Sequence, residues 1–168
     1  MSSKIQIVSP DTAFAESIGQ RLSEWGLSVS METDLLGVTP AVISDVDVVL
    51  LDIRKYEEKL IRWITSIRET LPSIEVILLN RAGEIKVSIE GMKAGATDEL
   101  SAPFDTATLR DTVSAALSRR KKHIRSNKLS LLERFQQAMS AVTFAQSGEF
   151  ETARQIMDEQ KTSKTGGS

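Results

Sequence analysis

The chain has 168 residues and a formal net charge of −2, which predicts no general attraction to nucleic acid or to an anionic membrane. Hydrophobic residues make up 40% and charged residues 26% of the chain, proportions typical of a globular domain with room for an extension. The absence of cysteine excludes disulfides and thiolate chemistry, and together with a single histidine it argues against a structural zinc site.

The first predicted elements are a strand and a helix. Residues 5–8 form a short apolar run, and Ser9-Pro10 then gives an N-cap followed by proline in a first helical turn. The apolar stripe of this helix, spaced by three or four residues, consists of Phe14, Ile18, Leu22 and Trp25. Gly26 is expected to end the helix.

The same alternation continues to about residue 118. Further strands are expected at residues 27–31, 46–51, 74–79 and 97–100. Thr39-Pro40 predicts a short helix through residues 41–43. Longer helices are indicated by three sets of apolar residues: Leu60, Trp63, Ile64 and Ile67; Ile85, Ile89 and Met92; and Leu109, Val113, Ala116 and Leu117. Five strands alternating with five helices predict a doubly wound parallel α/β sheet, with the most apolar strand, residues 46–51, at its centre.

The composition changes after residue 118, so we expect a domain at 1–118 and a helical extension at 119–160. The basic run 119–125 is interpreted as a continuation of the preceding helix, since cations are favourable near a helix C-terminus. Apolar stripes (Leu131, Leu132, Phe135, Met139 and Val142, then Phe150, Ala153, Ile156 and Met157) predict an α-helical hairpin. Its turn is expected at Ser147-Gly148, and a disordered tail at 161–168.

Two other interpretations of the extension are less favoured. Residues 141–157 match part of one tetratricopeptide-repeat unit, but solenoids need about three repeats for stability. The basic run could contact DNA, but no helix-turn-helix pattern follows it and the next segment contains several carboxylates, so we expect no nucleic-acid partner. The apolar stripes need a cover, which could be the first domain, a second copy in a homodimer, or a partner helix.

Asp52 is the first candidate for chemistry. It directly follows the apolar run 46–51, and open α/β sheets place their active sites at the C-terminal ends of such strands. An aspartate in this position can also simply cap the following loop.

With Asp52, the five strand–helix units, the segment 91–98 and the pair Pro103-Phe104, residues 4–118 resemble a response-regulator receiver domain. The resemblance implies a flavodoxin-like sheet of order 2-1-3-4-5 and a role in two-component or phosphorelay signalling. It implies that Asp52 is the phosphoacceptor. In the family, an acidic pair after strand one holds Mg²⁺ with this aspartate, while a Ser or Thr after strand four and a Lys after strand five bind the phosphoryl oxygens.

The sequence departs from that pattern at every position except Asp52. The acidic pair falls on Ser9 and Pro10, which are poor magnesium ligands. The Ser or Thr falls on Asn80 and the lysine on Ala102, so the lysine's positive charge is lost. A carboxylate that attacks an anionic phosphoryl group needs cations to offset repulsion, so these losses predict a weak reaction.

Two compensations remain open. Asp11 could act as a metal ligand beside Asp52, or it could only complement the dipole of the first helix. Arg54 or Lys55 could place a cation near Asp52, and the preferred interpretation is that both are solvated loop charges. We therefore expect no certain cofactor and at most weak Mg²⁺ binding at Asp52 and Asp11.

The expected function is that of a degenerate receiver, not an enzyme, which acts by contact with a signalling partner such as a histidine kinase. Asn80 and Glu99, near the family's switch positions, argue against the usual switch. The alternative is a functional single-domain response regulator phosphorylated on Asp52 by a histidine kinase. A flavin- or nucleotide-binding enzyme would need a glycine-rich phosphate loop, which residues 9–12 lack. Without a signal-peptide core or a membrane-spanning apolar stretch, the chain is expected in the cytoplasm.

Overall fold

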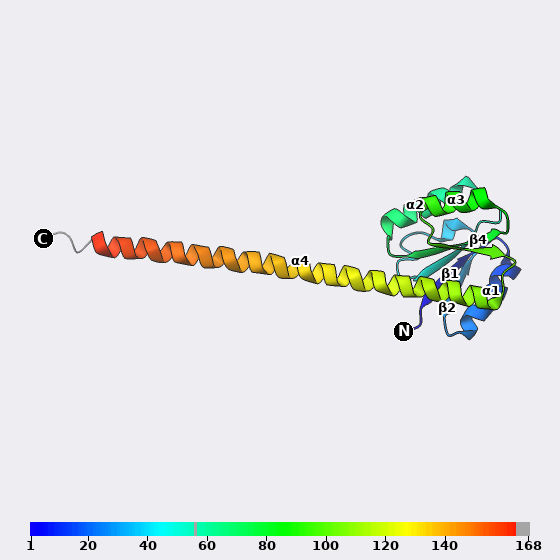
Figure 1. The fold of residues 1–168 in the computed structure, drawn as a ribbon, viewed down its shortest axis with the longest axis horizontal. Helices are drawn as coiled ribbons and strands as arrows, with labels where there is room; N and C mark the ends of the chain where they lie inside the picture. The colour runs from blue at the N-terminus through cyan, green and yellow to red at the C-terminus, as the bar shows by residue number, and fades with distance from the viewer. Residues whose placement is uncertain (56, 164–168) are drawn as a thin grey trace. The chain divides into compact units, whose positions relative to one another are not determined.

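The structure is a computed structural model that describes the backbone of residues 1–55 and 57–163 and the side chains of 1–55 and 57–142 (Figure 1). The strands are β1 (Lys4–Val8), β2 (Ser28–Glu32), β3 (Val48–Asp52), β4 (Glu75–Arg81) and β5 (Asp98–Ala102). The helices are α1 (Thr12–Glu24), α2 (Glu58–Thr70), α3 (Ile85–Ala94) and α4 (Thr106–Ser163), with a 3₁₀ turn η1 (Leu35–Gly37). The chain divides into two compact units, Met1–Ile124 and Arg125–Ser168.

The five strands form one parallel sheet in the order β2-β1-β3-β4-β5, which confirms the predicted topology. All five residues of β3 are buried, as expected for a central strand between two layers of helices. The edge strand β2 is mostly exposed, consistent with its weak apolar signal in the sequence. Asp52 lies opposite Leu79 of β4, so the last residue of β3 is held in register by the neighbouring strand.

Helices cover both faces of the sheet. Helices α2 and α3 lie on one face, and α1 and the first turns of α4 lie on the other (Figure 1). Gly91 of α3 packs closely against β4, because a Cβ atom there would lie 2.4 Å from Leu78 Cδ1. Gly95 ends α3 in the left-handed region with φ +116°, a conformation that favours glycine.

Two predictions at helix starts are wrong. The N-cap of α1 is Asp11, whose Oδ1 accepts a hydrogen bond from the backbone N–H of Phe14 at 3.0 Å, whereas Ser9 lies in the preceding loop. The helix predicted after Thr39 is a series of turns at residues 40–45. A segment this short fixes several backbone angles for very few hydrogen bonds, so it does not form a helix before β3.

The apolar residues that indicated α3 do not form its buried side. Ile85, Ile89 and Met92 are all exposed. The core contacts of α3 come from Gly91 and, partly, from Val87 and Ala94. The 3.6-residue periodicity therefore predicted the helix correctly, while its apolar stripe is a surface feature.

The predicted C-terminal hairpin is wrong, because α4 is a single helix from Thr106 to Ser163. Ser147 and Gly148 lie inside it. A glycine in a helix interior costs only about 1 kcal/mol relative to alanine, and no proline follows Pro103, so nothing in the sequence forces a turn. Residues 161–163 of the expected tail belong to α4, and residues 164–168 lie outside the described residues. The second predicted stripe, residues 150–157, and most of the tetratricopeptide-like pattern lie where side chains are not described.

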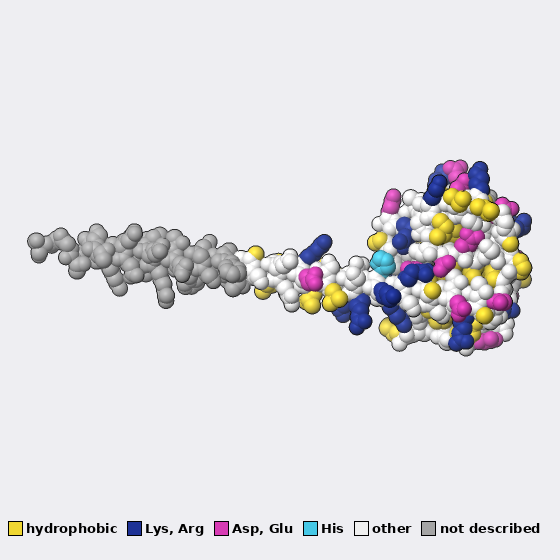
Figure 2. Space-filling model, in the orientation of Figure 1, with side chains coloured by type: hydrophobic (Ala, Val, Ile, Leu, Met, Phe, Trp, Pro, Cys, Tyr) yellow, Lys and Arg dark blue, Asp and Glu magenta, His cyan; other side chains and the backbone are white. Residues whose placement is uncertain are grey.

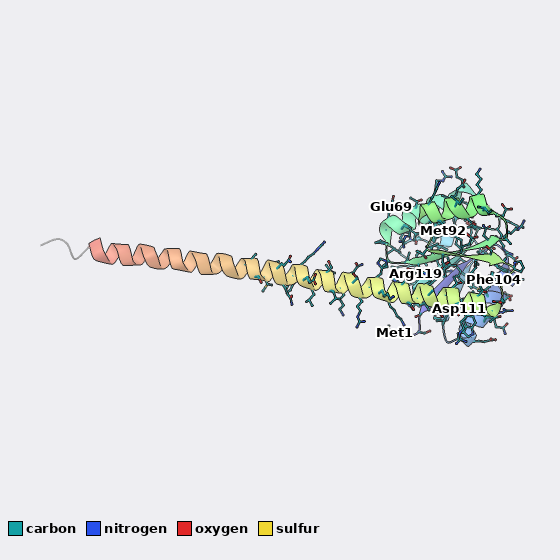
Figure 3. All side chains as sticks on the ribbon, in the orientation of Figure 1. Met1, Glu69, Met92, Phe104, Asp111 and Arg119 are labelled. Carbon is teal, nitrogen blue, oxygen red and sulfur yellow. The ribbon has the colours of Figure 1, made fainter. Side chains whose placement is uncertain are left out.

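Two arginines of the basic run tie α4 to the sheet within the first unit. Arg119, labelled in Figure 3, pairs with the buried Glu75 at 2.8 Å and with Asp98 at 3.3 Å. Arg120 lies 3.6 Å from Asp47 and donates a hydrogen bond to Ser73. These carboxylates stand at or just before the N-terminal ends of their strands, so part of the basic run is neutralised inside the domain. Over the part of the chain that the structure describes, no helix is long and apolar enough to cross a membrane.

Candidate functional site

Asp52 lies where the sequence placed it, at the C-terminal end of the central strand. It is 6% exposed, and the neighbouring Ser9, in the loop directly after β1, is completely buried. The backbone N–H of Ser9 donates to the carbonyl of Glu32 at 2.9 Å, which fixes the loop beside Asp52. The position is that of an active site in an open α/β sheet.

Both oxygens of the Asp52 carboxylate are occupied by hydrogen bonds from two residues. Oδ1 accepts from the backbone N–H of Arg54 at 3.0 Å and from its Nε at 2.9 Å. Oδ2 accepts from Nη2 of Arg54 at 2.8 Å and from the hydroxyl of Ser9 at 2.6 Å. A carboxylate offers about four lone-pair sites, so these four bonds saturate it.

Arg54 is also held by two residues of α1 and its cap. Its Nη2 lies 3.1 Å from Oδ2 of Asp11, and its guanidinium carbon lies 3.7 Å from the centroid of the Phe14 ring. The ring face attracts the cation, and the two carboxylates flank it. The guanidinium therefore bridges the ends of β1 and β3, with one positive charge between two negative ones.

The charges of this cluster reinforce one another. Burial of Asp52 acts to raise its pKa, but hydrogen bonds from Arg54 and Ser9 outweigh burial and hold the pKa below its ordinary value. The bond to Asp52 raises the pKa of Arg54. The pKa of Asp11 is lowered mainly by the hydrogen bond from the Phe14 N–H and next by the hydrogen bond from Arg54. At neutral pH all three groups are charged.

The structure decides between the two interpretations of the loop cations. Arg54 is a partner of Asp52 and not a solvated charge, while Lys55 is exposed and has no ion pair among the described residues. Lys55 and Asp52 help to line an open cavity of about 350 Å³. The sequence signal for the pair was weak, because the direction in which the Arg54 side chain points depends on the fold.

Asn80 is directed to other partners than Asp52. Its Nδ2 donates to the carbonyl of Glu84 at 3.2 Å and to Ser88 Oγ at 3.0 Å. Ser88 in turn donates to the Glu99 carboxylate at 2.8 Å. This polar network joins β4, α3 and β5, and in this part of the structure Asn80 makes no hydrogen bond to Asp52. Ala102 ends β5 and supplies no charge.

The donor set does not fit the Mg²⁺ that the fold family implies. Magnesium needs oxygen ligands in near-ideal octahedral geometry, usually including carboxylates. Here Arg54 already pairs with both nearby carboxylates, Asp52 and Asp11, and Pro10 offers no side-chain oxygen. The described residues contain no group of three or more His, Asp or Glu that could hold a metal ion.

Comparison with known proteins was made by sequence and by structure. No protein-family model matches the chain. The transcriptional regulatory protein ZraR of Klebsiella oxytoca is 31% identical over 115 residues, which are 68% of this chain and 26% of that protein. The probable transcriptional regulatory protein SilR of Salmonella typhimurium is 31% identical over 134 residues, or 77% of this chain and 58% of that one. The response regulator MprA of Mycobacterium bovis is 29% identical, and the match covers 72% of this chain and 53% of that protein.

Solved structures with the same fold include a CheY-like response regulator receiver domain from Methanospirillum hungatei. It has a TM-score of 0.65 and 22% identity, and the match covers 73% of this chain and 99% of that one. NtrX from Brucella abortus, solved in complex with ADP, has a TM-score of 0.69 and 21% identity, and the match covers 77% of this chain and 29% of that one. At these identities the likeness concerns the fold.

The five-stranded parallel domain, with an aspartate closing its central strand, has the same fold as the CheY-like receiver domain. Together with the sequence relatives, this means that the chain belongs to the response-regulator receiver family, as its resemblance implied. It is thus a signal-transduction module of the response-regulator type. The chain spans between about a quarter and somewhat over half of the length of the curated relatives it matches.

Proposed function

We propose that this chain is a degenerate receiver that works in the cytoplasm by protein–protein contact, without phosphorylation and without catalysing a reaction. The single observation that carries the proposal is the paired attachment of Arg54 to both oxygens of Asp52. An acceptor carboxylate must present a free oxygen to the phosphorus, with cations beside the reacting oxygens to offset repulsion. Here the lone pairs are occupied by the chain's own residues.

Removing Arg54 from the site would be costly. Asp52 is almost completely buried, and breaking a buried ion pair typically costs several kcal/mol because the remaining charge is left uncompensated. A phosphoryl donor would have to displace the guanidinium and then bring more negative charge beside Asp11. Arg54 supplies one positive charge, whereas the family uses a divalent cation and a lysine. The unmodified form of Asp52 is therefore strongly favoured.

The surface around α3 and β5 supports a role in contact without a switch. The Asn80–Ser88–Glu99 network holds α3 to its neighbouring strands and does not involve Asp52. Ile85 and Ile89 of α3 are exposed, and clustered apolar side chains on a surface commonly mark interaction sites. The partner is a signalling protein, for which a histidine kinase is one candidate. A homodimer through the C-terminal stripe is one of the three covers that the sequence left open, and it is not part of this proposal.

The proposal is tested by an amide NMR titration of the full chain with Mg²⁺ and then with Mg²⁺ plus beryllofluoride, a phosphoryl mimic. We expect no saturable shifts around Asp52, Asn80 and Ala102 at millimolar Mg²⁺. Saturable shifts at these residues that disappear in an Asp52→Asn variant would contradict the proposal.

The second candidate function is a working receiver phosphorylated on Asp52. The observation in its favour is the open cavity beside Asp52, to which the exposed Lys55 could bring a cation. The same titration separates the two candidates, because a working acceptor must respond to beryllofluoride through Asp52.

A further inference from the structure

The described part of the second unit exposes an apolar face of α4. Its large apolar side chains are between 53% and 67% exposed, and they are Leu129, Leu131, Leu132, Phe135, Met139 and Val142. Leu131, Leu132, Phe135, Met139 and Val142 recur at spacings of three and four residues, so they share one side of the helix, and Leu129, three residues before Leu132, lies at the edge of that side. With Leu131 and Leu132 adjacent, the stripe is wider than the two positions per heptad of a simple coiled-coil seam. Such a stripe is typical of a helix packed among other helices.

One end of this face is cationic. Arg125 and Lys128 line a hollow on the helix together with Leu129, Leu131, Leu132 and Phe135. Neither Arg125 nor Lys128 has an ion pair with any residue that the structure describes. Residues 125–142 contain three cationic side chains and one carboxylate. Figure 2 shows basic and hydrophobic side chains side by side on this stretch.

The placement of Lys128 separates the candidate occupants. It lies one heptad before Phe135 and two before Val142, so it is in line with the apolar stripe and not on the opposite side. On a lipid surface this ammonium group would start from the middle of the apolar face, and its stem would have to bend away from that face to reach the headgroups. A second copy aligned in parallel and in register would bring Lys128 against Lys128. A partner helix that presents apolar residues to the stripe and a carboxylate to Lys128 avoids both problems.

We propose that residues 125–142 bind an amphipathic helix of a partner protein that presents acidic side chains to Arg125 and Lys128 and apolar ones to Leu131 and Phe135. The contact has the helix-in-groove form of recognition, with anchors spaced three and four residues apart. The inference goes beyond the proposed function, because it holds whether or not Asp52 accepts a phosphoryl group.

The test uses the full chain and two synthetic amphipathic helices of four heptads. The peptides share one apolar face and carry either glutamate or lysine beside it. Fluorescence anisotropy of the labelled peptides should show the glutamate peptide binding about tenfold or more tightly than the lysine peptide. Lys128→Glu should reverse that preference, and Phe135→Ser should weaken binding of both peptides while the amide spectrum of the first unit stays unchanged.

Three results would overturn the inference. One is equal binding, or no binding, of the two peptides. Another is a dimer of the chain alone in sedimentation that Phe135→Ser dissociates, which would assign the face to a second copy. The third is binding to phosphatidylcholine–phosphatidylglycerol vesicles in preference to the glutamate peptide, which would assign it to a lipid surface. The beryllofluoride titration is a separate readout, so the two proposals can fail independently.

Discussion

The guanidinium of Arg54 donates to both carboxylate oxygens of Asp52, from Nε at 2.9 Å and from Nη2 at 2.8 Å. In a receiver domain this carboxylate is the group on which the family's chemistry depends. A chain with Arg54 in this position has an internal cation that is always present, so the charge of the site does not depend on a metal or a phosphoryl donor.

Replacement of Arg54 by alanine should destabilise the first unit by about 2–4 kcal/mol, because it leaves Asp52 buried with only Ser9 as a side-chain partner. Urea denaturation followed by tryptophan fluorescence measures the change. Lys55→Ala is the matched control, since Lys55 is exposed in the same loop and should change stability by no more than about 0.5 kcal/mol. Equal effects of the two substitutions would show that the pair does not stabilise the fold.

The stability that comes from Asp52 should depend on pH in the acid range. The pKa of Asp52 is lower in the folded chain than in the unfolded one, so the unfolded state binds protons first as the pH falls. The contribution is fully present above the ordinary aspartate pKa of about 3.9 and is lost as the pH falls through the lowered value. The difference in unfolding free energy between the wild type and Asp52→Asn should therefore be constant between pH 5 and 7 and shrink below about pH 4. A difference that instead changes between pH 5 and 7 would assign a raised pKa to Asp52.

The fold could be predicted because its signals are local. Apolar runs, a glycine stop and the aspartate after residues 46–51 each depend on a few neighbouring residues, and they predicted the parallel sheet, its central strand and the position of Asp52, whereas the strand order came from the resemblance to the receiver family. The continuous α4 was missed because Ser147-Gly148 is only a weak turn signal. Keeping a glycine inside a helix costs about 1 kcal/mol relative to alanine, which is small next to the gain from uninterrupted backbone hydrogen bonding.

The arrangement of the site could not be predicted in the same way. The direction of Arg54 is set by Asp11 and Phe14, which are about 40 residues away in the sequence and become neighbours only through the β1–β3 pairing. The buried partner of the basic run, Glu75, is likewise distant from Arg119. Sequence patterns specify which residues stand at the end of a strand, but ion pairs between elements depend on the packed structure.

The pair formed by Arg119 and Glu75 should be strongly coupled. Glu75 is 3% exposed, so Arg119→Ala leaves a buried carboxylate without its partner. We expect the free energy of unfolding to fall by about 3 kcal/mol, the lower end of the range for a broken buried pair, because Arg119 itself is partly exposed. Glu75→Gln in the same background should recover part of the loss, because the uncompensated charge is removed. A double-mutant cycle of unfolding free energies should give a coupling of about 1–3 kcal/mol, and additive effects within about 0.5 kcal/mol would contradict the pairing.

Replacement of Gly91 by alanine should destabilise the domain although it improves helix propensity. Alanine gains about 1 kcal/mol over glycine inside a helix. The new methyl group would lie 2.4 Å from Leu78 Cδ1, and Leu78 is completely buried in β4, so either α3 or that side chain must shift. Overpacking of this kind costs about 1–3 kcal/mol, so the expected net loss is up to about 2 kcal/mol in urea denaturation. Lys86→Ala, on the exposed side of α3, serves as the control and should be nearly neutral. A Gly91→Ala variant more stable than the wild type would mean that α3 can move away from the sheet at little cost, and the helix would then be a mobile element of the contact surface.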